Sequence, residues 1–241
     1  MKKFKTVSKY QSEMKTKSIL LALFILAPIL SSAQVSWIVK GGPSANVSNQ
    51  GLFGSDAKAG GRIGVGMEYS LGRIVSIQPA LMLNFKGAKE KSTSRIDYSS
   101  EDITHTTYTC NTTNYRQTYI EVPVDVLFRV RLHEQKNALV FSVGPYFAYG
   151  IGGNTTLTKN VNGVRREYKE DTFSENGINM RRFDFGLSNG VYFELKKHLT
   201  FGAYYEYGLI KTKDNQRDDT FYDWYFGKKN LSLGLEVGYR F

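Results

Sequence analysis

Apolar and polar side chains alternate with a period of two residues along the C-terminal end of the chain. One parity holds Leu231, Leu233, Leu235, Val237, Tyr239 and Phe241, and the other holds Ser232, Gly234, Glu236, Gly238 and Arg240. Successive side chains of a β-strand point to opposite faces of a sheet. This segment therefore predicts a strand with one apolar face and one face of small or charged residues.

The same split recurs in seven segments upstream, which are therefore also predicted to be strands. They lie around residues 37–45, 62–69, 75–86, 119–130, 139–150, 183–195 and 199–209. The first is the weakest and carries Lys40 on its polar parity. After Gln34, no apolar run approaches the roughly 18 residues that a membrane-spanning helix requires.

Short connections alternate with long ones between these segments. Short turns are predicted at 71–73, 131–137 and 196–198, and long polar connections at 46–60, 87–116, 151–181 and 211–229. Short turns at one rim and long loops at the other are typical of outer-membrane barrels. The sequence thus predicts an all-β fold, an eight-stranded antiparallel up-and-down transmembrane β-barrel with short periplasmic turns and long extracellular loops.

Two of the long connections differ in composition. Residues 92–113 contain 11 Ser or Thr among 22 positions, which predicts a polar loop with little apolar surface to bury. Residues 155–169 alternate around Asn162 and Gly163, a strong hairpin signal, so we expect strands to continue beyond the membrane there. Either segment could add a further pair of strands, which leaves ten strands as an alternative.

Composition decides which parity faces inward. The interior of an eight-stranded barrel is just wide enough for side chains to fill it, so small residues and compensating charges fit there and the apolar parity faces lipid. Hydrocarbon offers no partner to backbone N–H and C=O groups, so the strands must close into a cylinder. Candidates for the aromatic girdles are Tyr69, Phe85, Tyr119 and Tyr149. We expect a lumen charge network formed by Lys40, Arg62, Glu68, Glu121, Asp125, Arg129, Asp184, Glu206, Glu236 and Arg240.

The N-terminus has the organisation of a secretory signal peptide. Lysines precede the apolar run 19–30, and the small residues 31–33 provide a cleavage site. We therefore expect a signal peptide over 1–33, with Met14 as an alternative start, and a barrel domain over 34–241. This organisation predicts export to the outer membrane.

The net charge and the cysteine content exclude one class of partner and one kind of covalent cross-link. The formal net charge is +10, and it falls to +5 without residues 1–33 because six Lys and one Glu are lost. Half of the basicity thus belongs to the export signal, which removes the case for a nucleic-acid partner. The single cysteine, Cys110, excludes an intramolecular disulfide.

No catalytic constellation is apparent in the sequence. His105 falls in the Ser/Thr-rich segment, whereas His133 and His198 fall in turns at the opposite rim. No two of them can therefore meet a carboxylate at the outer rim. We predict no enzymatic activity, no metal site and no cofactor. A conducting pore is disfavoured because eight strands leave little free cross-section.

The last long connection is the candidate site for partner binding. Exposed aromatic residues beside charges suit contact with an extracellular or envelope protein or with a glycan. The alternative is that these rings form the upper aromatic belt of the barrel. The residues concerned are Phe221, Tyr222, Trp224 and Tyr225.

Several runs resemble the PorT-like outer-membrane β-barrel family. They lie at residues 119–123, 143–147, 183–186 and 205–209 and at the terminal Phe241, and the resemblance covers essentially the whole mature chain. It implies the barrel fold and an outer-membrane location. The family's namesake belongs to a protein-secretion apparatus, and the resemblance is specific for fold rather than for this role.

The C-terminal segment also resembles the sorting signal that the barrel-assembly machinery reads. This resemblance implies that Val237, Tyr239 and Phe241 serve insertion, and the alternative is that they only face outer-membrane lipid. We therefore expect a non-enzymatic outer-membrane protein with a structural or surface-interaction role through its loops. The alternatives are a component of a secretion apparatus and a small pore.

Overall fold

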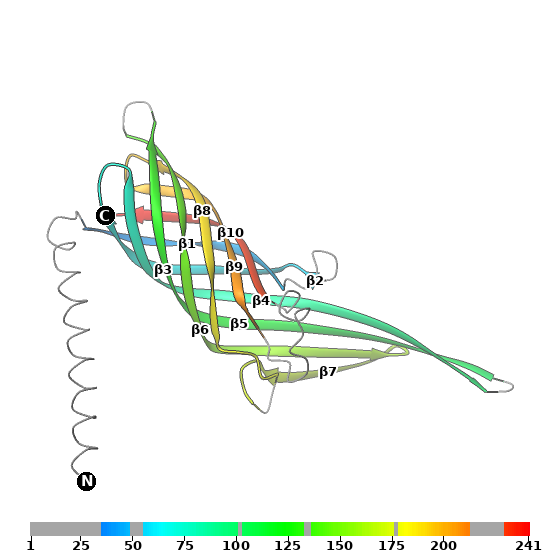
Figure 1. Cartoon of the computed structure of the whole chain (residues 1–241). Coiled ribbons are helices and arrows are strands. Elements are labelled where there is room, and N and C mark those ends of the chain that lie inside the picture. The colour runs from blue at the N-terminus through cyan, green and yellow to red at the C-terminus, as the bar shows by residue number, and fades with distance from the viewer. Residues whose placement is uncertain (1–34, 49–54, 101–102, 133–135, 176–177, 213–228) are drawn as a thin grey trace, which may run out of the picture.

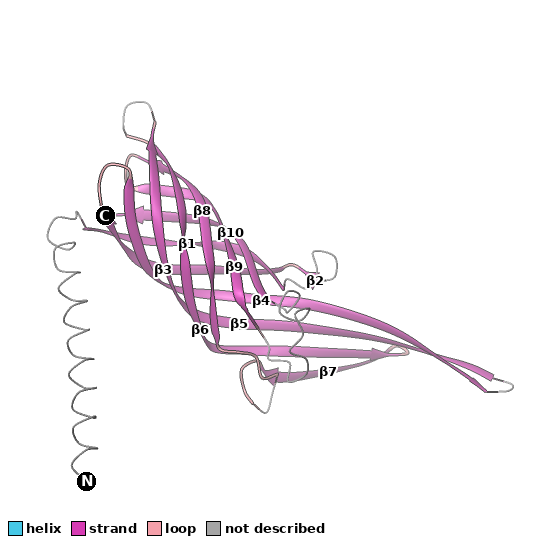
Figure 2. Cartoon of the chain, viewed as in Figure 1, coloured by secondary structure: helices cyan, strands magenta, loops and turns pink. Residues whose placement is uncertain are grey.

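The computed structural model describes residues 35–48, 55–100, 103–132, 136–175, 178–212 and 229–241. No helix within these ranges is long and apolar enough to cross a membrane. The described part of the chain forms strands (Figure 1 and Figure 2), which are β1 (Val35–Ser48), β2 (Ser55–Asp56), β3 (Lys58–Ser70), β4 (Val75–Ser100), β5 (Ile103–Arg131), β6 (Ala138–Val161), β7 (Val164–Asp171), β8 (Phe183–Leu195), β9 (Leu199–Lys211) and β10 (Lys229–Arg240).

Eight of these strands close into a ring. The order around the ring is β4, β3, β1, β10, β9, β8, β6 and β5, and β5 pairs with β4 to close it. Every neighbouring pair is antiparallel. The remaining strands, β2 and β7, attach to β4 and β6 outside the ring. The predicted eight-stranded barrel is confirmed, and the ten-stranded alternative is wrong because neither extra strand joins the ring.

Short turns connect the strands at one end of the barrel. The connections between β3 and β4, between β5 and β6 and between β8 and β9 span 71–74, 132–137 and 196–198. In the last of these, Lys196 and Lys197 adopt φ values of 51° and 65°, as the two central residues of a type I′ turn require, and the His198 N–H donates to the Leu195 carbonyl. These connections agree with the predicted short turns, and the C-terminus lies at the same end (Figure 1).

At the opposite end, a long extension of the sheet continues beyond the ring (Figure 1). We call residues 87–116 of β4 and β5, together with residues 152–171 of β6 and β7, the arm. Asn162 and Gly163 have φ values of 49° and 88° and form the predicted hairpin turn. The prediction of a loop over 92–113 was wrong, because β4 and β5 pair as far as Ser100 and Ile103. Cross-strand pairing satisfies the backbone N–H and C=O groups of this segment, and its many threonines have a high propensity for strands.

A β-bulge marks the base of the arm on β6. Tyr119 pairs with Gly150 and Thr118 pairs with Gly152, so Ile151 is an extra residue relative to β5. Bulges change the side-chain alternation of one strand relative to its neighbour. The inward positions of β6 are even-numbered below the bulge and odd-numbered above it, where Thr155 is fully buried.

The two walls of the barrel differ as the alternation predicts. On β10, Leu235 is 63% exposed on the outer wall, and the adjacent Glu236 is 3% exposed inside. Phe85 and Tyr149 also lie exposed on the outer wall, at positions suited to an aromatic girdle. Tyr119 does not, because it shares the inward parity of β5 and is buried inside. Its assignment to a girdle was wrong.

Gly144 on β6 tests the strand register. A Cβ at this position would lie 2.0 Å from the Val124 carbonyl oxygen, a backbone atom held by its own strand, whereas a Cβ at Gly152 on the same strand would meet nothing within 4 Å. We expect Gly144→Ala to destabilise the barrel by about 1–3 kcal/mol. Heat-modifiable gel mobility after refolding in detergent should show a smaller folded fraction for this variant. Gly152→Ala should fold like the parent, and equal folding of both variants would contradict the register.

Candidate functional site

Every residue of the predicted lumen charge network lies inside the ring. Nine of the ten residues are buried, and the Arg240 side chain is 15% exposed. Lys86 and Glu194 are buried with them and were missing from the prediction. Both fall on the inward parity of their strands, so the alternation contained the signal that would have found them.

Arg62 on β3 ties three strands together across the lumen. Its Nε atom lies 2.6 Å from Glu236 Oε2 on β10, and its Nη1 atom donates a hydrogen bond to Glu206 Oε1 on β9. The guanidinium also lies 3.3 Å from the centroid of the Tyr204 ring. Charge-assisted hydrogen bonds and the ring face thus surround this cation on several sides.

Lys86 on β4 extends the network toward the arm. Its Nζ atom lies 2.8 Å from Glu121 Oε2 and 3.0 Å from Glu206 Oε2. Asn84 Nδ2 donates to the same two carboxylates over 3.1 Å and 3.4 Å. Two carboxylates held this close repel each other, and the ammonium between them offsets that repulsion.

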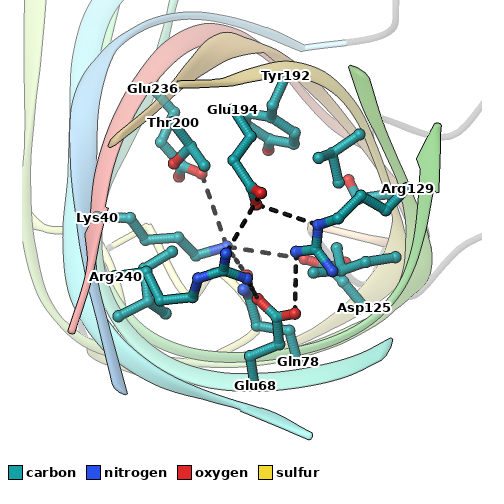
Figure 3. A pocket seen from close by; sticks show the side chains of 14 residues that line it. Lys40, Glu68, Gln78, Asp125, Arg129, Tyr192, Glu194, Thr200, Glu236 and Arg240 are labelled. Carbon is teal, nitrogen blue, oxygen red and sulfur yellow. Dashed lines mark hydrogen bonds and ion pairs between the residues drawn. The ribbon is translucent and has the colours of Figure 1, made fainter. Parts of the chain in front are cut away.

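Two guanidiniums and two carboxylates form a second cluster nearer the short turns (Figure 3). Arg129 lies 2.9 Å from Glu68 and 3.1 Å from Glu194. Arg240 lies 3.1 Å and 3.3 Å from the same two carboxylates. Each charge in this cluster therefore has two neighbours of opposite sign, contributed by β3, β5, β8 and β10.

Lys40 on β1 occupies the space beside this second cluster (Figure 3). Its Nζ atom lies 3.6 Å from Glu236 and 3.8 Å from Asp125, and it donates to Gln78 Oε1 over 3.2 Å. The cavity among these side chains has a volume of about 30 Å³. This is room for about one or two water molecules, so the interior is packed here rather than open.

The described lumen holds more carboxylates than cations. Seven acidic residues, Glu68, Glu121, Asp125, Asp184, Glu194, Glu206 and Glu236, face the five basic residues Lys40, Arg62, Lys86, Arg129 and Arg240. Because a buried charge is costly unless it is paired, the loss of any one of these cations leaves carboxylates uncompensated. The stability of the barrel is therefore expected to fall when any one of these cations is removed.

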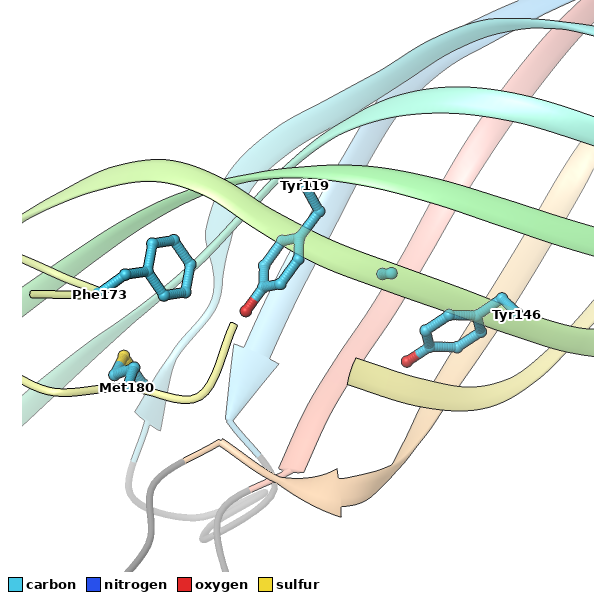
Figure 4. Packing of buried hydrophobic residues seen from close by; sticks show 5 residues of the cluster. Tyr119, Tyr146, Phe173 and Met180 are labelled. Carbon is cyan, nitrogen blue, oxygen red and sulfur yellow. The ribbon is translucent and has the colours of Figure 1, made fainter. Parts of the chain in front are cut away.

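An apolar cluster lies inside the barrel toward the arm (Figure 4). Its members are the buried residues Tyr119, Tyr146, Ala148, Phe173 and Met180. The rings of Phe173 and Tyr119 meet edge to face with centroids 5.7 Å apart. Phe173 and Met180 come from the described parts of the connection between β7 and β8, and both side chains pack in this cluster. The lumen is thus filled by ion pairs in its body and by apolar side chains at its outer end.

Two titratable side chains lie where the arm meets the rim, outside the membrane-spanning part. Lys58 Nζ donates to Asn114 Oδ1 over 2.5 Å, and the Tyr115 hydroxyl donates to Glu90 Oε2 over 3.4 Å. Burial, together with the nearby Arg116, lowers the pKa of Lys58 to about 8. Burial, together with Glu90, raises the pKa of Tyr115 to about 12. Both shifts favour the neutral side chain at this junction.

The other predicted site residues lie away from the lumen. Val237, Tyr239 and Phe241 point to the exterior, and Phe241 is 69% exposed. His198 stacks on Tyr239 at the end that carries the short turns, with ring centroids 5.9 Å apart. The candidate partner-binding residues lie outside the described residues, namely Phe221, Tyr222, Trp224 and Tyr225.

The described ranges contain no candidate metal site. Within them, no group of three or more His, Cys, Asp or Glu side chains could hold a metal ion. Cys110 lies exposed on the arm as a free thiol.

Comparison with known proteins places these features in context. The family model described as "Outer membrane protein beta-barrel domain" matches residues 10–214. No curated protein matches the chain.

Among solved structures, similar folds include Ail of Yersinia pestis, with 12% identity, coverage of 86% of this chain and 99% of that chain, and a TM-score of 0.37. Neisserial surface protein A has 11% identity, coverage of 88% and 100%, and a TM-score of 0.41. OprG from Pseudomonas aeruginosa has 10% identity, coverage of 87% and 97%, and a TM-score of 0.41.

Arg62→Met tests the energetic role of the ion pairs. The substitution leaves Glu206 and Glu236 buried without this cation, and we expect a loss of about 3–5 kcal/mol in the free energy of unfolding. Urea titration of the refolded protein in lipid vesicles, followed by tryptophan fluorescence, measures it. Adding Glu206→Gln and Glu236→Gln to the Arg62→Met variant should restore part of the loss, because it lowers the excess of negative charge in the lumen.

The control for this experiment is Arg165→Met on the arm. Arg165 forms an exposed ion pair with Glu167 over 3.5 Å, and such pairs contribute less than about 1 kcal/mol. A similar small loss for Arg62→Met would contradict a structural role for the lumen network.

Proposed function

The chain belongs to the outer membrane protein beta-barrel domain family, and from this membership we propose that it is a non-enzymatic outer-membrane protein whose closed barrel displays the arm for contact at the cell surface. Its location in the outer membrane follows from the family. The surface-contact role is our proposal. We also propose that the N-terminal segment 1–33 is a signal peptide that directs export.

The contrast between the lumen and the arm carries this proposal. The lumen contains ion pairs along its body and a buried apolar cluster toward the arm, which argues against passage of solutes. Along the edge of the arm, by contrast, every residue of β7 is exposed. Loops and extensions that a rigid scaffold presents to solvent are the usual positions for binding residues.

Biogenesis through the barrel-assembly machinery is a further part of the proposal. The C-terminal residues Val237, Tyr239 and Phe241 line the outer wall of β10, where an assembly factor could read them before the ring closes. The same exposure suits contact with lipid alone, so assembly by this route requires its own test in cells.

A role in protein secretion is the second candidate function. It is supported by the resemblance of the sequence to the PorT-like family and has no counterpart in the described geometry. Unchanged export of secreted proteins from a strain that lacks this protein would exclude it.

The closed lumen predicts that the purified barrel does not conduct ions in discrete steps. Planar bilayer recordings of refolded protein, with its fold checked by heat-modifiable mobility, should therefore remain silent. Reproducible single-channel steps from the folded fraction would instead favour the small pore. An unfolded preparation serves as the negative control for leak caused by insertion defects.

Shortening the arm tests the surface-contact role. Replacing 91–112 and 158–167 each with an Asn-Gly turn joins strands at the cross-strand pairs of Glu90 with Thr113 and of Leu157 with Tyr168. We expect the barrel to remain heat-modifiable, because the ring is untouched, and the cells to lose the surface contacts that cross-linking identifies in the parent. An unchanged set of cross-linked partners would remove the arm from the proposed function.

A further inference from the structure

The arm is a four-stranded antiparallel sheet with a basic groove on one face. Its strands run in the order β4, β5, β6 and β7, and the two-residue strand β2 borders β4 at Lys89 and Glu90. The paired residues form rows across the sheet, one of which joins Lys89, Asn114, Thr156 and Lys169, and the next of which joins Lys91, Thr112, Thr158 and Glu167. These side chains share one face because paired residues in an antiparallel sheet point to the same side.

The charges of this face lie on its outer strands. Lys89 and Lys91 come from β4, and Arg165 and Lys169 come from β7, whereas the middle strands supply mainly Thr and Asn side chains. Three strand spacings of about 4.8 Å separate the two basic edges by about 14 Å. The groove between them has a volume of about 510 Å³. It therefore has basic walls and a floor of hydrogen-bonding groups.

The opposite face of the arm lacks this excess of positive charge. The groove is lined by five cations, with Arg116 as the fifth, and by the carboxylate of Glu167. The register adds two acidic positions to the same face, Asp56 opposite Lys89 and Asp171 in the row of Arg116, so the cations remain in excess. On the opposite face, Lys159 and Arg166 are accompanied by Glu90 and Glu170. The positive charge is thus directed to one side of the sheet.

The basic face continues the wall that contacts lipid. On β4, Lys89 and Lys91 share the parity of the exposed Phe85, and on β5, Arg116 shares the parity of the exposed Ile120. Lys89 follows Phe85 by four residues, which is about 13 Å along a strand. By parity, the groove therefore continues the outer face of this wall and begins beyond Phe85, the last exposed apolar residue of β4 before Lys89.

We propose that this groove binds the phosphorylated headgroups of outer-leaflet glycolipid. Arginine offers a planar set of donors that matches phosphate, and lysine adds compact positive charge. Basic side chains just outside the hydrocarbon attract anionic lipid headgroups. The Thr hydroxyls and Asn amides of the floor supply donors and acceptors for sugar hydroxyls.

Continuity with the lipid-facing wall favours a lipid over a soluble polyanion. A glycolipid whose acyl chains lie against the outer wall near Phe85 would place its headgroup in the groove without any change in the direction of the wall. The proposal goes beyond the surface-contact role and is independent of it, since it assigns a ligand to the membrane-facing side of the arm.

The test uses the full mature barrel in nanodiscs of phosphatidylcholine doped with a bisphosphorylated lipid A. Native mass spectrometry counts the lipid A molecules that the protein retains. We expect retention by the parent, and we expect it to fall by at least about tenfold in a variant with Lys89→Gln, Lys91→Gln, Arg165→Gln and Lys169→Gln. A dephosphorylated lipid A should be retained no better than phosphatidylcholine.

The matched control removes four positive charges elsewhere, through Lys159→Gln, Arg166→Gln, Lys196→Gln and Lys197→Gln. Equal retention by both variants and the parent would overturn the proposal. Binding of a soluble sulfated oligosaccharide to the groove without retention of lipid A would assign it to a polysaccharide instead, and would also overturn it. If the groove variant fails to fold, retention by the parent should still fall as NaCl rises from 50 to 500 mM, because salt screens exposed charges, and salt-independent retention would contradict the proposal.

Discussion

The hydrogen-bonding demand of the backbone governs this structure. A strand in hydrocarbon has no water to accept from its N–H groups or donate to its carbonyls, so each strand needs a neighbour on both edges. The pairing of β4 with β5 meets this demand by joining the ends of the sheet. Beyond the membrane, the demand is relaxed, and β7 can lie at an edge of the arm with water at its open side.

Closure with eight strands in turn fixes what the interior can contain. The lumen is narrow enough for side chains from opposite walls to meet, as Arg62 meets Glu206 and Glu236. Polar and charged residues are suited to this space because the apolar ones are needed outside. Buried charges require partners of opposite sign, so the interior forms a connected ionic network, and binding functions are left to the arm.

The period-two alternation predicted the eight barrel strands, their short turns and the identity of the inward face. The ion pairs could not be predicted, because they depend on which residues of distant strands face one another. Lys86 meets Glu206, for example, only because of how the strands stagger around the ring. Tyr119 was assigned to a girdle from its residue type, although its parity matched that of Glu121. The arm over 92–113 was missed because low apolar content predicts little burial and says nothing of cross-strand pairing.

The extra residue at Ile151 sets the orientation of the hairpin that follows it. A shift of one residue in the pairing of a strand moves all later side chains to the opposite face of the sheet. If Ile151 paired with Thr118 in a regular ladder instead of bulging out, Thr156 and Thr158 would exchange sides with Thr155 and Leu157, and Arg165 and Lys169 on the paired β7 would turn inward with them. One bulged position in a long strand thus determines which side chains of β6 and β7 lie on the outer face of the arm and which lie on the face above the mouth of the barrel.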